Sequence, residues 1–296
     1  MTAPVSTRET GRRVAVRTTV DICSFVDRLT VEDVGELLVV ADATTNVPAV
    51  RGAVFVESGR VCWAAARGLA PRLTQLLMKP SGLDAAAMED LYRRCKLERA
   101  PLGEFLVKRG VVRPEDLRTA LLQHTTESLD ALCDERTVAS WWPRPGGYNA
   151  RFTFKTSELL AHWFAHRQGA TRDERATTLE AFSDSVPGEW GALFVRVPSV
   201  AAPLPLIVRG ALPEKSFAVL RVGKWAASAL DVAATFQDDD VRVTAMEPGG
   251  TTLVAWRHED GIVAGRMSAN GPARLLHQRA TARRAIRLAS SRRTQT

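Results

Sequence analysis

The spacing of hydrophobic residues in the first half of the chain predicts a mixed domain of strands and helices. Two extended apolar runs, 49–56 and 61–64, flank a polar turn and predict a β-hairpin, in which Gly59 supplies the positive φ of a tight turn. Just before them, residues 30–33 (Thr-Val-Glu-Asp) have the form of a capping box and predict a helix that continues to Ala41.

Apolar residues then recur at helical spacing along the next part of the chain. This periodicity predicts helices at 72–78, 85–97, 102–109 and 114–132. Gly110 suits a left-handed C-cap, and Pro114 suits the first turn of the helix that follows it. This half of the chain is predicted to end with a turn-rich break at 141–147, a strand at 151–155 and a helix from Ser157 to His166.

The second half of the chain changes to short strands around one long apolar helix. The predicted order is a helix at 171–182, strands at 192–197 and 204–209, a helix at 217–236, strands at 241–246, 252–257 and 262–267, and a last helix from Pro272. Pro205 favours an edge position for its strand, because proline cannot donate a backbone hydrogen bond. The order α-β-β-α-β-β-β-α predicts an antiparallel sheet covered by helices.

The predicted fold class of the chain is therefore α+β, in two domains. We expect a disordered leader over residues 1–18, a first domain over 19–168, a second domain over 171–282 and a basic tail over 283–296. The composition fits globular domains, because 45% of the 296 residues are hydrophobic and 25% are charged. Neither a membrane-spanning apolar run nor a secretory signal is evident, so a cytoplasmic protein is expected.

Positive charge is concentrated at the two ends of the chain. The net charge is +7, yet residues 261–296 alone carry eight arginines and no acid, and residues 1–20 carry +3, which leaves residues 21–260 at −4. A basic tail can bind nucleic acid or an anionic surface by Coulomb attraction. Aromatic residues are not interleaved with these arginines, so a stacking platform for single strands is not indicated.

Three groups of polar residues resemble chemical sites, and a structural role explains each of them better. Glu158, His162 and His166 share one helical face, as zinc ligands can, but the H-E-x-x-H motif is missing. The acids at 238–240 lack the glycine and the distal glutamate of a calcium loop. The four cysteines form no C-x-x-C pair, and no phosphate-binding glycine motif occurs. No cofactor, metal or catalytic residue is predicted.

The first domain resembles the PATAN domain, a bacterial regulatory module. The resemblance rests on residues 52–64 with Gly68, on residues 102–110 and 117–123, and on the ending Trp142…Gly147…Phe152-Thr153-Phe154. The family usually has a histidine in place of Trp63. Its helical part is also similar to the N-terminal domain of secretion and pilus ATPases, some of which bind cyclic di-GMP through paired Arg-Leu-Gly motifs. Here one copy is present, with Pro101 in place of the arginine.

The second domain, residues 172–282, is similar to the roadblock (profilin-like) fold in its order of elements. Such modules usually dimerise through the long helix and the neighbouring strand, and some act on small Ras-like GTPases. The resemblance implies a protein interface formed by Arg221, Lys224 and Trp225 on the long helix together with Arg242 on the next strand.

The expected function is that of a non-catalytic signalling adaptor or scaffold in a bacterial cytoplasm. Its partner is expected to be a small GTPase, a response regulator or a second copy of the chain in a homodimer. A DNA-associated transcriptional regulator that uses the arginine-rich ends is the alternative, and nucleic acid is not the favoured partner. A metal-dependent enzyme centred on His162 and His166 is a third hypothesis.

Overall fold

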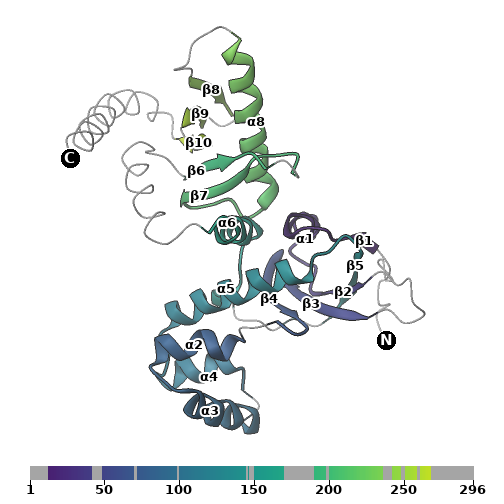
Figure 1. Ribbon diagram of the computed structural model, residues 1–296, viewed down its shortest axis with the longest axis vertical. Helices are drawn as coiled ribbons and strands as arrows, with labels where there is room; N and C mark the ends of the chain where they lie inside the picture. The colour runs from purple at the N-terminus through teal and green to yellow at the C-terminus, as the bar shows by residue number, and fades with distance from the viewer. Residues whose placement is uncertain are drawn as a thin grey trace, which may run out of the picture. The chain divides into compact units, whose positions relative to one another are not determined.

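The computed structural model describes residues 13–41, 49–69, 72–98, 100–144, 146, 150–169, 190–197, 200–235, 242–247, 251–258 and 261–267 (Figure 1). The chain divides into two compact units, Met1–Leu159 and Leu160–Thr296. The division falls within helix α6 (Thr156–Arg167), ahead of the boundary expected at 169–170. Each unit contains a five-stranded antiparallel sheet packed with helices, which confirms the α+β class.

The sheet of the first unit has the strand order β1-β5-β2-β3-β4. Its members are β1 (Arg13–Ala15), β5 (Thr137–Pro143), β2 (Gly35–Ala41), β3 (Val50–Glu57) and β4 (Arg60–Ala66). The predicted hairpin is confirmed as β3 and β4, and the two residues of its turn, Ser58 and Gly59, have positive φ angles of 54° and 70°. The expected leader is wrong from Arg13 onward, because β1 pairs with β5 in the fold.

A hydrophobic core joins this sheet to helix α1 (Thr19–Val26) and to the end of helix α5 (Pro114–Leu132). Phe154 is fully buried in it, and its backbone exchanges two hydrogen bonds with that of Val61, of 2.8 and 3.0 Å. The strand predicted at 151–155 is therefore wrong except for this single bridge at Phe154. Residues Ala150–Phe152 instead form a short 3-10 helix.

The helices predicted after the hairpin are confirmed and build a second apolar cluster of the same unit. They are α2 (Leu73–Ser81), α3 (Ala85–Leu97), α4 (Leu102–Lys108) and α5. Gly110 follows α4 with a φ of 68°, and Pro114 is the first residue of α5, as predicted. The cluster between these helices contains Leu77, Met88, Cys95, Phe105, Leu106, Val112, Leu117 and Ala120.

Two predictions for the first unit are wrong because strand pairing prevails over local signals. The carboxylate of Asp33 does accept hydrogen bonds from the Thr30 amide and hydroxyl, at 2.7 and 2.9 Å, but these contacts close a turn. The residues after it form β2, whose backbone pairs with both β3 and β5. Likewise, the predicted break at 141–147 begins inside β5, where Trp141 is buried.

The sheet of the second unit has the order β7-β6-β10-β9-β8. Its strands are β6 (Trp190–Val195), β7 (Leu204–Gly210), β8 (Arg242–Met246), β9 (Thr252–His258) and β10 (Gly261–Met267), close to the predicted ranges. The strand with Pro205, β7, lies at the edge as predicted. The helices predicted at 171–182 and from Pro272, the acids at 238–240 and the basic tail lie outside the described residues.

The long helix of this unit is α8 (Ser216–Ala234), and it packs along the sheet (Figure 1). Its buried side contributes Val219, Val222, Ala226, Ala227 and Leu230 to a core shared with β6, β9 and β10. A Cβ atom at Gly223 would lie 2.6 Å from Cδ1 of Phe194, so the helix backbone comes close to the sheet at this point.

Candidate functional site

The outward side of α8 forms a stripe of exposed residues that we call the α8 outer face. Its members are Phe217, Arg221, Lys224, Ser228 and Asp231, spaced three or four residues apart as one side of a helix requires. The stripe is not uniformly polar, because Phe217 is 45% exposed and Val232, beside Asp231, is 63% exposed. Exposed apolar side chains next to charged ones are a common composition of protein interfaces.

The structure brings three of the four predicted interface residues together on this helix. Arg221 and Lys224 are exposed, and neither has an ion pair among the described residues. Trp225 is half-buried and packs against the core of the unit. Arg242 opens the edge strand β8 in register with Trp256, and its side chain lies outside what the structure describes.

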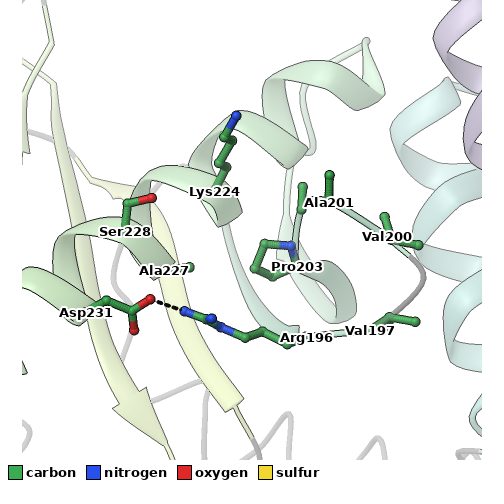
Figure 2. Close-up of a pocket in the computed structure, with 10 residues that line it drawn as sticks. Arg196, Val197, Val200, Ala201, Pro203, Lys224, Ala227, Ser228 and Asp231 are labelled. Carbon is green, nitrogen blue, oxygen red and sulfur yellow. Dashed lines mark hydrogen bonds and ion pairs between the residues drawn. The ribbon is translucent and has the colours of Figure 1, made fainter.

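A groove of about 390 Å³ runs between α8 and the connection from β6 to β7. The helix lines it with Lys224, Ala227, Ser228 and Asp231, and the connection lines it with Arg196, Val197 and residues 200–203. Figure 2 shows Arg196 reaching along the groove to Asp231, while Lys224 extends from the helix away from that pair. Among the described residues, Arg196 and Asp231 therefore form an ion pair at one part of the groove, while the ammonium group of Lys224 has no ion-pair partner.

The carboxylate of Asp231 on α8 forms ion pairs with two arginines, Arg196 and Arg257. It accepts from the Arg196 guanidinium, and its second oxygen lies 3.1 Å from Nη2 of Arg257 on β9. The hydrogen bond from Arg196 is the main reason that the pKa of Asp231 is lowered, and Arg257 adds to the effect. No local spacing in the sequence marks this cluster, because its members lie far apart in the chain.

Three of the four cysteines are buried, and their surroundings do not favour the thiolate that a nucleophile requires. Burial raises the pKa of the Cys23, Cys62 and Cys95 thiols, in the case of Cys62 to about 12, and a reactive cysteine needs the opposite shift. Cys133 is half-buried and donates to the Leu129 carbonyl oxygen at 3.0 Å. Thiolate catalysis therefore has no support at the three buried positions.

The proposed zinc ligands do not converge. Both oxygens of Glu158 accept hydrogen bonds from the Arg118 guanidinium, at 2.7 and 2.9 Å, so this carboxylate already has a cationic partner. Within the described ranges, no three histidine, cysteine, aspartate or glutamate side chains gather as a metal site would require. The described residues therefore give no support to a metal site centred on His162 and His166.

Among the helices that the structure describes, none combines the length and the apolarity that crossing a membrane requires. Comparison with protein-family models, with curated proteins and with solved structures gave no match.

Proposed function

We propose that this protein is a non-catalytic adaptor or scaffold that binds a protein partner through the α8 outer face. The observation that carries the proposal is the pair Arg221 and Lys224, two exposed cations without ion pairs in the described chain, beside the half-buried Trp225. Arginine and tryptophan are among the residues that contribute most to binding energy at protein interfaces. The buried side of the same helix fixes their positions.

The charge of the surface favours a partner with an acidic patch. Asp231 is occupied by two arginines, so the positive charge of Lys224 and Arg221 is left to be balanced by another molecule. The resemblances to a PATAN domain and a roadblock module support a role in bacterial signalling. A small Ras-like GTPase, a response regulator or a second copy of this chain are the partners that we propose, in the cytoplasm.

The test is affinity capture from the native cell with mass spectrometry, combined with sedimentation of the purified protein over a range of concentrations. We expect Arg221→Glu plus Lys224→Glu to abolish capture of the specific partner or to abolish self-association. The matched control is Lys79→Glu plus Lys108→Glu, which reverses two exposed lysines of the first unit. Equal capture by both variants, and the same oligomeric state, would show that the α8 outer face is not the interface.

The arginine-rich C-terminal segment supports one alternative, a DNA-associated regulator. Residues 261–296 carry eight arginines and no acid, and such a segment binds phosphates with a steep dependence on salt. Deletion of residues 278–296 should then abolish DNA binding in a mobility-shift assay. Unchanged binding after the deletion would contradict this role for the tail.

A further inference from the structure

The first unit contains a second cavity, which we call the Trp63 pocket. It has a volume of about 420 Å³ and lies where strand β4 meets helices α2, α4 and α5. Its apolar walls are formed mainly by Trp63, Leu73, Leu102, Leu117, Leu121 and Phe152. Small-molecule sites typically have volumes of roughly 300–1,000 Å³ and aliphatic and aromatic linings, with few polar groups that orient the ligand.

The indole ring of Trp63, the main aromatic part of this pocket, is held in place by a neighbouring ring. The indole ring of Trp63 stacks on the imidazole ring of His124, with centroids 4.6 Å apart and an angle of 10° between the planes. His124 belongs to the long helix α5 and is itself buried. A ring fixed in one orientation loses little further freedom when a flat molecule packs against it, which favours binding.

The polar groups of the lining set the charge of a suitable ligand. Glu104, an exposed residue of α4, is the carboxylate of the lining and has no ion pair among the described residues. The other ionisable side chain of the lining is Cys62, whose thiol stays neutral because burial raises its pKa to about 12. The negative charge of Glu104 would repel an anionic ligand. A cationic ligand would be attracted both by this carboxylate and by the indole ring of Trp63.

We propose that the Trp63 pocket binds a small aromatic amine, whose ring packs between Trp63 and the leucines and whose ammonium group pairs with Glu104. The pocket belongs entirely to the first unit, so this proposal is independent of the protein interface on α8. Its ligand class follows from an apolar, aromatic lining that carries one uncompensated negative charge.

The test uses two probes that share one ring system and differ in charge, 1-naphthylmethylamine and 1-naphthylacetate. Isothermal titration of the full chain should show saturable binding of the amine with one site per chain. The acetate should bind severalfold more weakly, since an ion pair with the exposed Glu104 is replaced by repulsion. Ligand-observed NMR gives the same comparison if binding is weak.

Two variants make the result specific to the pocket. Glu104→Gln should bring the affinities of the two probes close together, and Trp63→Ala should remove saturable binding of both, with circular dichroism confirming that each variant folds. Glu32→Gln, which removes an exposed acid elsewhere in the unit, should bind like the wild type. Absence of saturable amine binding, equal affinity for both probes, or an unchanged preference in Glu104→Gln would each overturn the proposal.

Discussion

Trp63 and His124 form a parallel ring stack that joins the edge strand β4 to helix α5. His124 is 8% exposed, and its Nδ1 atom has no hydrogen-bond partner among the described residues. Burial lowers the pKa of His124, and the negative charge of Glu127 offsets only part of this effect. The folded protein therefore keeps the imidazole neutral at a pH where the unfolded chain already binds a proton.

This histidine predicts a pH dependence of stability. The pKa of His124 in the folded state lies below its ordinary value of 6.5, so the unfolded chain binds more protons as the pH falls below that value. The contribution of the neutral His124 to the free energy of unfolding is fully present above pH 6.5. It is lost as the pH falls from 6.5 through the lower pKa of the folded state. His124→Phe, which keeps an aromatic ring, should show a flatter loss of stability than wild type across this window.

The measurement for this prediction is urea denaturation followed by circular dichroism at several pH values on both sides of the ordinary histidine pKa. His166→Gln is the control, because it removes a histidine that is exposed at the end of α6. A His124→Phe profile that runs parallel to wild type would mean that another group causes the dependence.

Gly223 predicts an unusual response to alanine. In a helix interior, alanine is favoured over glycine by about 1 kcal/mol. Here a Cβ atom would lie 2.6 Å from Cδ1 of Phe194 and 3.1 Å from the Pro203 carbonyl oxygen, so α8 would have to move away from the sheet. We expect Gly223→Ala to lower the melting temperature, and Ser228→Ala, on the exposed side of α8, to change it little. A higher melting temperature for Gly223→Ala would show that the backbone of α8 lies farther from Phe194 and Pro203 than described.

Phe154 predicts a large loss of stability in the first unit. The side chain is fully buried, and the Arg118 guanidinium lies over its ring at 5.1 Å from the centroid. Phe154→Ala leaves a cavity and should lower the free energy of unfolding by about 3–5 kcal/mol in urea titrations. Phe217→Ala, at a residue of α8 that is 45% exposed, provides the matched comparison and should cost far less. Similar losses in the two variants would contradict the described core.

The paired carboxylate of Asp231 predicts a small, salt-dependent effect. Both of its arginine partners are at least half exposed, and such pairs contribute up to about 1 kcal/mol. Asp231→Asn should therefore lower stability by no more than this at low salt and neutral pH. At about 1 M salt, where the screening length is roughly 3 Å, wild type and variant should melt alike. A difference that persists at high salt would indicate a packing role instead.

The buried thiols predict slow reaction with a disulfide reagent. Cys23, Cys62 and Cys95 are buried, and burial raises the pKa of each, so little thiolate forms near neutral pH. With Ellman's reagent we expect Cys133, the half-buried cysteine, to react first, and the other three to react only in denaturant. Cys133→Ser should remove the fast phase. Rapid labelling of more than one cysteine in the native protein would contradict this burial.

Local signals predicted those parts of the fold that short segments determine by themselves. The turn at Gly59, the cap at Gly110 and the helix start at Pro114 depend on the conformations that one residue type allows, so one sequence sufficed. The helix predicted to continue to Ala41 and the break predicted at 141–147 are wrong where β2 and the end of β5 form, because only the partners in the sheet decide the conformation of these segments. Strand propensity depends strongly on such context.

In the candidate site, too, the sequence predicts the local features and not the contacts between distant residues. Helical periodicity placed Arg221, Lys224 and Trp225 on the long helix, and the structure finds them on α8. Asp231 pairs with Arg196 and Arg257, which are far from it in the sequence. Hydrophobic periodicity does not predict ion pairs between distant residues. Charge pairing across a fold becomes visible only when the strands and the helix are positioned.

Pro205 makes the two edge strands of the second sheet, β7 and β8, unequal as hydrogen-bond donors. It interrupts the row of amide hydrogens along β7, and a foreign strand cannot form an unbroken ladder on such a border. The opposite border, β8, contains no proline, so each of its amides that points away from β9 can donate a hydrogen bond. An added strand would therefore find a continuous row of outward amides on β8 and an interrupted row on β7.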